Sequence, residues 1–108
     1  MSNRVYLGEL EELILLMVAL LKDEAYGVSI TEMLKKTANR EITISATHAA
    51  LHRLETKGFV KSKMGGASTE RGGRRKRMFN ITAYGRNALE DLRDTRENIW
   101  TMIKPAVV

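Results

Sequence analysis

Between Gly58 and Ile81 the chain leaves a helical hydrophobic period once, and this single interruption restricts its fold more than any other feature. Residues 59–63 and 76–81 have the pattern of two short β-strands. The stretch between them contains two glycine pairs, Gly65-Gly66 and Gly72-Gly73, which predict a flexible polar turn. The sequence on both sides follows a helical period. We therefore expect one antiparallel hairpin set among helices.

Three helical patterns precede this hairpin. The first runs from Leu7 to Leu21 and has little polar surface in its second half, so we expect it to be largely buried. The second runs from about Gly27 to Thr37. The third runs from about Ser45 to Lys57, with Thr43 or Ser45 as its N-cap. Gly58 follows at the position where a helix favours a left-handed C-cap.

The third helix has two contrasting faces. At 100° per residue, one face gathers Thr47, Ala50, Leu51 and Leu54. The opposite face carries Ser45, Ala49, His52 and Thr56, with His48 and Arg53 on its flanks. This second face is small and polar and has few long charged side chains. A merely solvated helix face more often carries Glu and Lys.

The helical period resumes at Thr82 and continues to about Lys104, where Pro105 ends it. Its apolar residues form a heptad-like seam. No further element of the chain follows to cover that stripe, so we expect it to pack on the first helix and on a second subunit. The expected dimerisation residues are Leu10, Ile14, Ala88, Leu92, Thr95, Ile99, Trp100, Met102 and Ile103.

The positive charge of the chain is concentrated in one segment. Residues 61–77 carry a local charge of +6, whereas the net charge of the whole chain is +5. Such a cluster is typical of an element that binds a polyanion. A solvated basic loop that only aids solubility is the alternative interpretation of the cluster taken alone.

Three helices followed by a two-stranded hairpin are the order of a winged helix-turn-helix, a mainly α (α+β) fold. We expect a DNA-binding domain in residues 1–81 and a dimerisation helix in residues 82–108, packed on the same domain. In this fold the third helix enters the major groove and the hairpin, or wing, lies along the phosphates. The candidate DNA-binding residues are Tyr26, Ser45, Thr47, His48, Ala49, His52, Arg53, Lys61, Lys63, Arg71, Arg74, Arg75, Lys76 and Arg77.

Several short segments stand in a specific order along the chain: Tyr26-Gly27, residues 51–55 and 57–60, the basic run 70–77, and Ile81-Thr82 with Gly85. Through these segments the chain resembles, over nearly its whole length, the PadR family of bacterial transcriptional regulators. The resemblance implies a homodimeric winged-helix repressor that acts on operator DNA. Two departures concern detail: His48-Ala49 stands where the family commonly has Tyr-Pro, and Met78 where it usually has a tyrosine.

The same residues argue against catalysis. No Ser-His-acid set, paired-carboxylate cleft or cofactor loop occurs at a usable spacing, so we expect no enzyme activity and no cofactor. His48 and His52 have metal-ligand spacing, but Ala49 stands where the protease motif needs glutamate. We therefore expect no metal site. The longest apolar run has nine residues, too few to span a membrane, so we expect a cytoplasmic protein with no membrane partner.

Several roles stay open at this stage. Arg53 is compatible with a DNA contact or with an internal ion pair to Glu55 or Glu41. Trp100 is compatible with interface packing or, because some family relatives bind flat aromatic compounds, with an effector pocket formed with Tyr6 and Met17. Two other functions remain as alternatives: a protein-interaction module whose long helix pairs with another protein, and an RNA-binding winged helix. The small polar third-helix face favours DNA, because the major groove of A-form RNA is too narrow to read.

Overall fold

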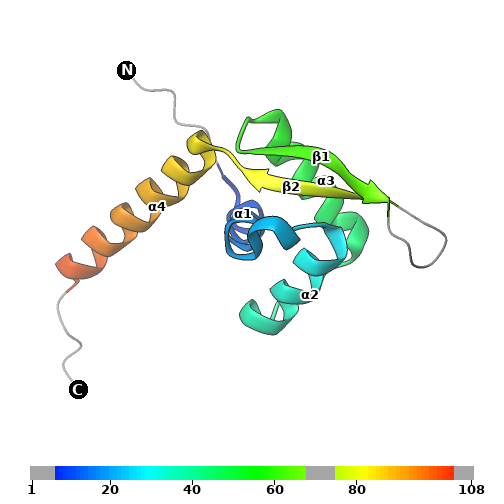
Figure 1. The fold of residues 1–108 in the computed structure, drawn as a ribbon. Coiled ribbons are helices and arrows are strands. Elements are labelled where there is room, and N and C mark those ends of the chain that lie inside the picture. Colours follow the sequence, from blue (N-terminus) through cyan, green and yellow to red (C-terminus); the bar gives the residue numbers. More distant parts are fainter. Residues whose placement is uncertain (1–6, 68–74, 104–108) are drawn as a thin grey trace.

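The computed structural model describes residues 7–67 and 75–103. Along the chain lie α1 (Glu9–Leu21), the short 3₁₀ helix η1 (Lys22–Glu24), α2 (Gly27–Ala38), α3 (Ile44–Thr56), β1 (Val60–Ala67), β2 (Arg75–Ile81) and α4 (Ala83–Met102). The three first helices form a cluster, the two strands make a hairpin beside α3, and α4 runs away from them (Figure 1). This is the predicted mainly α winged helix with a long C-terminal helix.

The core lies among α1, α2, α3 and the base of the hairpin. Each element contributes the apolar side of its period, and the side chains that are fully or almost fully buried are Ile14, Leu15, Val18, Ala25, Ile30, Leu34, Ala50, Leu51, Leu54, Phe59, Val60 and Phe79. Burying one large aliphatic or aromatic side chain is worth about 1.5–3 kcal/mol, so this cluster supplies the main stabilisation of the domain.

The ends of α3 are fixed by local signals. The Thr43 side chain accepts a hydrogen bond from the backbone N of Ala46 at 3.0 Å, so Thr43 is the N-cap. After the helix, Gly58 has a φ of +85°, the left-handed conformation expected there. The backbone N of Phe59 then donates to the carbonyl of Leu54 at 2.9 Å. These contacts turn the chain sharply from α3 into β1.

The hairpin is antiparallel and tied to the helices at its base. Val60 pairs with Ile81 and Ser62 with Phe79, and an irregularity in register follows between Met64 and Ala67. The backbone N of Phe79 also donates to the carbonyl of Ala25, at 2.9 Å. The loop between η1 and α2 therefore lies against β2 and ties this edge of the hairpin to the helices.

Helix α4 is attached by its first turns. Thr82 caps it by accepting from the backbone N of Gly85 at 2.9 Å. A Cβ at Gly85 would lie 2.9 Å from Cγ1 of Ile81, so only glycine allows this approach. Ala88 and Leu89 pack against the core, but every residue from 93 to 103 is exposed.

Candidate nucleic-acid interface

Helix α3 presents the polar face that its period predicts. Ser45, Ala49 and His52 are exposed, while Ala50, Leu51 and Leu54 on the opposite side are completely buried. The side chains on the exposed face are short or planar. A nucleic acid could therefore approach the backbone of this helix closely, with hydroxyl, methyl and imidazole groups at the surface.

Thr47 corrects one of the site predictions. We expected it to contact DNA, but it is fully buried. Its hydroxyl lies 2.6 Å from that of Thr31 on α2 and donates to the carbonyl of Thr43 at 3.3 Å. Thr47 therefore joins α2 to α3 from the inside, which agrees with its place on the apolar face of the helix.

Tyr26 and His48 lie where α2 meets α3 and the hairpin. The imidazole of His48 packs on Gly27, where a Cβ would lie 2.8 Å from its Cε1 atom. Lys76 of β2 holds its Nζ 4.1 Å from the centre of the Tyr26 ring, a cation–π contact. The N-terminal end of α2, the flank of α3 and β2 therefore form one continuous surface.

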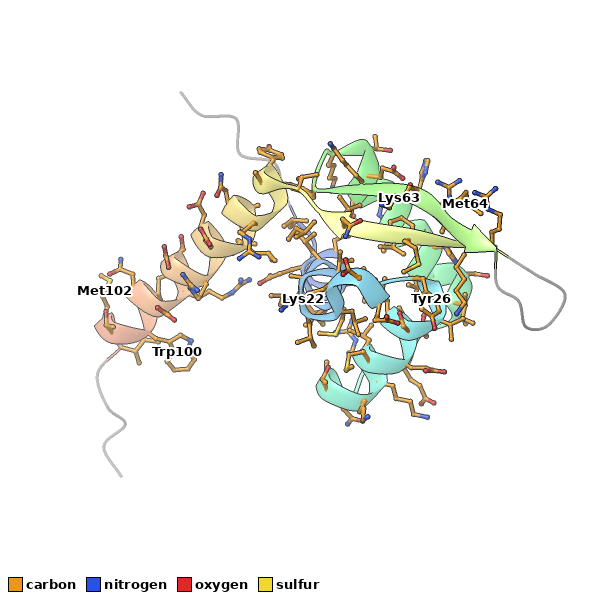
Figure 2. The ribbon with its side chains drawn as sticks, viewed as in Figure 1. Lys22, Tyr26, Lys63, Met64, Trp100 and Met102 are labelled. Carbon is orange, nitrogen blue, oxygen red and sulfur yellow. The ribbon has the colours of Figure 1, made fainter. Side chains whose placement is uncertain are left out.

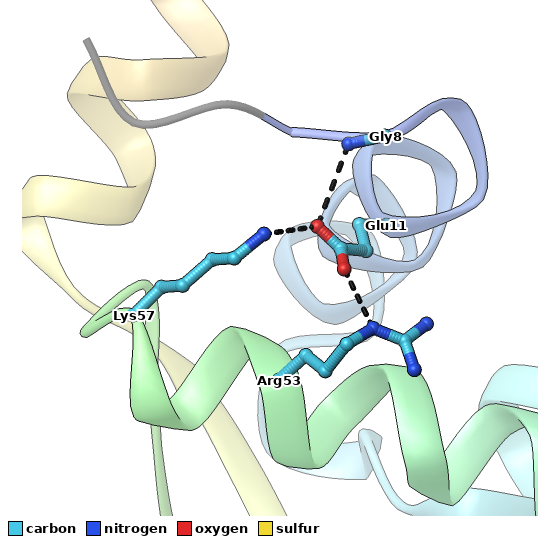
Figure 3. Close-up of polar contacts among 4 residues, drawn as sticks. All are labelled: Gly8, Glu11, Arg53 and Lys57. Carbon is cyan, nitrogen blue, oxygen red and sulfur yellow. Dashed lines mark hydrogen bonds and ion pairs between the residues drawn. The ribbon is translucent and has the colours of Figure 1, made fainter.

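Arg53 has a partner that the sequence did not indicate. Its Nε donates to Oε2 of Glu11 at 2.7 Å, and Nζ of Lys57 donates to Oε1 of the same carboxylate at 2.7 Å (Figure 3). The expected partners Glu55 and Glu41 are engaged elsewhere, with Ser62 and Lys35 respectively.

Glu11 is itself one of the two buried polar residues in the described part of the chain. Burial alone would raise the pKa of its carboxyl, but the hydrogen bonds from Lys57 and Arg53 outweigh burial and hold the pKa below its usual range. Glu11 and Lys57 therefore form an ion-pair cluster with Arg53 that the sequence reasoning missed. The one signal present was the spacing of Glu11, in phase with the buried Ile14, Leu15 and Val18.

The hairpin carries the basic side chains at its surface, where Lys61, Lys63, Arg75, Lys76 and Arg77 are all exposed. Two of them are fixed by local bonds. Arg77 donates to Oγ of Ser62 at 3.0 Å, and Arg75 donates to the carbonyl of Gly65 at 3.1 Å. Arg71 and Arg74, also predicted to bind DNA, lie outside the described residues.

A second surface lies between α1 and α4, at the end of the molecule opposite the hairpin. Figure 2 shows Trp100 and Met102 on α4, far from Lys63 and Met64 on the hairpin. A groove of about 420 Å³ separates the two helices, with Leu16, Ala19, Leu89 and Trp100 among its apolar lining. Arg96 crosses to Glu12 of α1 at 2.7 Å.

The predicted dimerisation residues divide into three groups. Ile14 is fully buried in the core, so its assignment to an interface is wrong. Leu10, Ala88 and Leu92 are half-buried. Exposed positions on or just after α4 are Thr95, Ile99, Trp100, Met102 and Ile103.

The predicted effector pocket is also corrected. Met17 lies in the core, where its sulfur accepts a hydrogen bond from Thr37 at 3.6 Å, and it does not line the groove beside Trp100. Tyr6 falls outside the described residues. The side chains of α1 that reach the groove are Leu16, Ala19 and Glu12.

Two further features are absent from residues 7–67 and 75–103. No three histidine, cysteine or acidic side chains gather there in an arrangement that could hold a metal ion. No helix in that part of the chain is long and apolar enough to cross a membrane.

Comparisons with known proteins agree with this fold. A PadR family transcription regulator from Clostridium difficile R20291 superposes with a TM-score of 0.72 at 24% identity, covering 88% of this chain and 94% of that one. A PadR-like transcriptional regulator from Bacillus cereus gives a TM-score of 0.68 at 22% identity, covering 86% and 85%.

Bacillus subtilis PadR, solved in complex with operator DNA, gives a TM-score of 0.61 at 22% identity and covers 92% of this chain and 51% of its own. Comparison with curated proteins gave no match. The model of the transcriptional regulator PadR-like family matches residues 15–91. With a match over that span and the winged-helix architecture around it, the chain belongs to the PadR-like family of transcriptional regulators.

Proposed function

We propose that the protein is a cytoplasmic, homodimeric repressor that binds operator DNA through α3 and the hairpin. One observation carries the proposal: His48 and His52 of α3 line the same surface hollow as Arg77 of β2, so the small exposed face of α3 continues into the basic surface of the hairpin. That B. subtilis PadR shares this fold and was solved with operator DNA supports the same use of the surface here.

The two parts of this surface have different tasks. Ser45, Ala49 and His52 offer hydrogen-bonding groups and a methyl group to base edges in the major groove. The lysines and arginines of the hairpin neutralise phosphates, which gives affinity for any sequence and makes binding depend on salt. Arg77 and Arg75 are already held by hydrogen bonds to Ser62 and Gly65, so less side-chain freedom is lost on binding.

Dimerisation is proposed for residues 82–108, and DNA binding for residues 1–81. Trp100 and Met102 are 70% and 71% exposed, and large apolar side chains gathered at this level mark an interaction surface. A second copy that covers them would close the groove between α1 and α4. A small aromatic effector that stacks on Trp100 there would change the geometry of the dimer and so relieve repression.

Binding to the DNA immediately upstream of the gene tests the proposal. Fluorescence anisotropy at two salt concentrations would compare this fragment with a scrambled one. We expect tight, salt-sensitive binding that prefers the native fragment. Equal and weak binding to both fragments would contradict a repressor.

Charge variants then locate the surface. Arg75→Ala with Arg77→Ala should weaken binding to both fragments and lower the salt slope by about 0.9 for each phosphate that the variant no longer neutralises. Lys35→Ala with Lys36→Ala removes the same charge from the C-terminal end of α2 and is the matched control. Equal effects of the two pairs would mean that net charge alone governs binding.

A protein-interaction module remains the second candidate, because the same exposed Ile99, Trp100 and Ile103 would suit the helix of another protein. Sedimentation equilibrium of the purified chain separates the two. A stable dimer supports the repressor. A monomer that binds neither DNA fragment and co-purifies with a defined partner supports the module, and a preference for double-stranded RNA would indicate the RNA-binding alternative.

A further inference from the structure

We propose that Glu11 is a positioning residue for DNA binding: by holding Nε of Arg53, it presents the terminal amino groups of that guanidinium to a DNA phosphate beside α3. The inference rests on the proposed function and adds to it a residue of α1, on the side of α3 away from the basic hairpin. It assigns Arg53 an internal bond and an external contact at the same time.

The geometry of the guanidinium supports this double role. Glu11 contacts only Nε of Arg53, at 2.7 Å, and within the described residues the two terminal nitrogens have no hydrogen-bond partner. Figure 3 shows them directed away from the carboxylate. A guanidinium is planar and rigid, so fixing Nε also fixes the plane of the two amino groups. A forked donor of this kind matches the oxygens of a phosphate.

Exposure and charge agree with an external contact. The side chain of Arg53 is 50% exposed, whereas that of Glu11 is 9% exposed. The carboxylate is shared with Lys57, whose side chain is 28% exposed. Of the two cations that bind this carboxylate, Arg53 is the more exposed. An anion that approaches this flank of α3 would therefore meet Arg53 first.

The position of Arg53 on the helix places this contact beside the reading face. Arg53 follows Ala49 by four residues, so the two lie on the same side of α3, one turn apart. A duplex seated on Ser45, Ala49 and His52 would bring a strand of its backbone to that flank. Contacts of this kind fix the register of a protein on DNA.

The direction in which one substitution changes DNA affinity distinguishes a positioning role of Glu11 from a general effect of charge. Glu11→Gln makes the protein more positive by one charge, which alone would tighten binding to DNA. If Glu11 positions Arg53, the same substitution weakens binding. Glu9→Gln is the matched control, because it changes the charge equally in the first turn of the same helix, where the partner of Glu9 is Arg40.

The experiment measures anisotropy of the labelled upstream fragment with the full chain and its variants. Glu11→Gln should weaken binding by about tenfold, the effect of removing one charge-assisted hydrogen bond to phosphate. Glu9→Gln should bind as the wild type does or more tightly. Binding by Glu11→Gln that equals or exceeds that of the wild type would overturn the proposal.

Arg53→Lys gives an independent result if Glu11→Gln unfolds, which thermal melting would reveal. Lysine keeps the charge but has one ammonium group, which cannot hold Glu11 and present a fork to phosphate together. We expect a similar loss of affinity, and no further loss in the double variant with Glu11→Gln. Unchanged affinity of Arg53→Lys would overturn the positioning role, whereas failure of the wild type to bind the fragment would overturn the proposed function itself.

Discussion

Helices α3 and α4 are both amphipathic, but α3 buries its apolar face from Thr47 to Leu54, whereas α4 packs against the core only near its N-terminal end, through Ala88 and Leu89. Leu51 and Leu54 of α3 are completely buried, whereas Ile99 and Trp100 of α4 are 52% and 70% exposed. The surface that α3 leaves open is accordingly polar, and the surface that α4 leaves open is apolar. Within the described residues α3 is therefore covered by its own domain, while the C-terminal half of α4 keeps its apolar side chains exposed.

The largest effect should come from removing a side chain under α3. Leu51→Ala should lower the free energy of unfolding by about 2–5 kcal/mol, because it leaves a cavity in the core. Ile99→Ala on α4 is the control and should change the stability of the monomer by less than about 0.5 kcal/mol. Chemical denaturation at low protein concentration measures both. Similar losses would remove the distinction between the helices.

The affinity of the proposed dimer should depend on the exposed side chains of α4. Trp100→Ala should weaken the proposed dimer by about 2 kcal/mol, because large aromatic side chains dominate interface energetics. Thr101→Ala, an exposed neighbour on α4, should leave the dissociation constant nearly unchanged. Sedimentation equilibrium decides the matter, and an unaltered dimer in Trp100→Ala would place the interface elsewhere.

The buried hydroxyl pair behind α3 should have a smaller effect. Thr31→Val removes the partner that lies 2.6 Å from the Thr47 hydroxyl and should cost about 1 kcal/mol, since Thr47 keeps its bond to the carbonyl of Thr43. Thr56→Val makes the same change at an exposed residue of α3 and is the control. Equal thermal stability of the two variants would mean that the buried pair contributes nothing to the joint between α2 and α3.

The smallest expected effect is the loss of the Glu11 contact between α1 and α3 at acid pH. The pKa of Glu11 is lowered in the folded protein, so its stabilisation is complete above the unfolded value of about 4.3 and is lost as the pH falls through the folded pKa. The melting temperatures of the wild type and Glu11→Gln should therefore converge as the pH is lowered from about 6 to about 3. Parallel curves would show that the carboxylate does not titrate in this way.

The periodicity of the sequence predicted the order of the elements and came close to their ends. It predicted α3 near residues 45–57, and the helix spans Ile44–Thr56. Local signals such as the Thr43 cap and the left-handed Gly58 were sufficient there, because each acts within a few residues. Hydrophobic spacing also separated the exposed face of α3 from its core face, although Thr47 was still assigned to DNA.

Periodicity and local signals could not predict contacts between side chains that are far apart in the sequence. Arg53 and Glu11 lie 42 residues apart, and charge patterns near Arg53 suggested Glu55 or Glu41 instead. Which carboxylate reaches the guanidinium depends on how α1 crosses α3, and that crossing is decided by packing of the whole core. The prediction that Met17 lines a pocket with Trp100 was wrong for the same reason. The sequence of a helix as apolar as α1 does not reveal which of its sides faces α4.

Helix α4 is fixed to the domain mainly by its first turns, and the rest of the helix extends away from it. The helix has 20 residues and spans about 30 Å. Gly85, Ala88 and Leu89 pack against the domain at its N-terminal end, and farther along the Arg96–Glu12 ion pair joins it to α1. A pivot of about 10° at the N-terminal end would carry the far end through about 5 Å. In the proposed dimer, two α4 helices joined near their C-terminal ends set the distance between the two copies of α3. This distance must match the spacing of successive major grooves on one side of DNA, about 34 Å. A change in the tilt of the two α4 helices would then lower the affinity of the dimer for operator DNA without changing the structure around either α3.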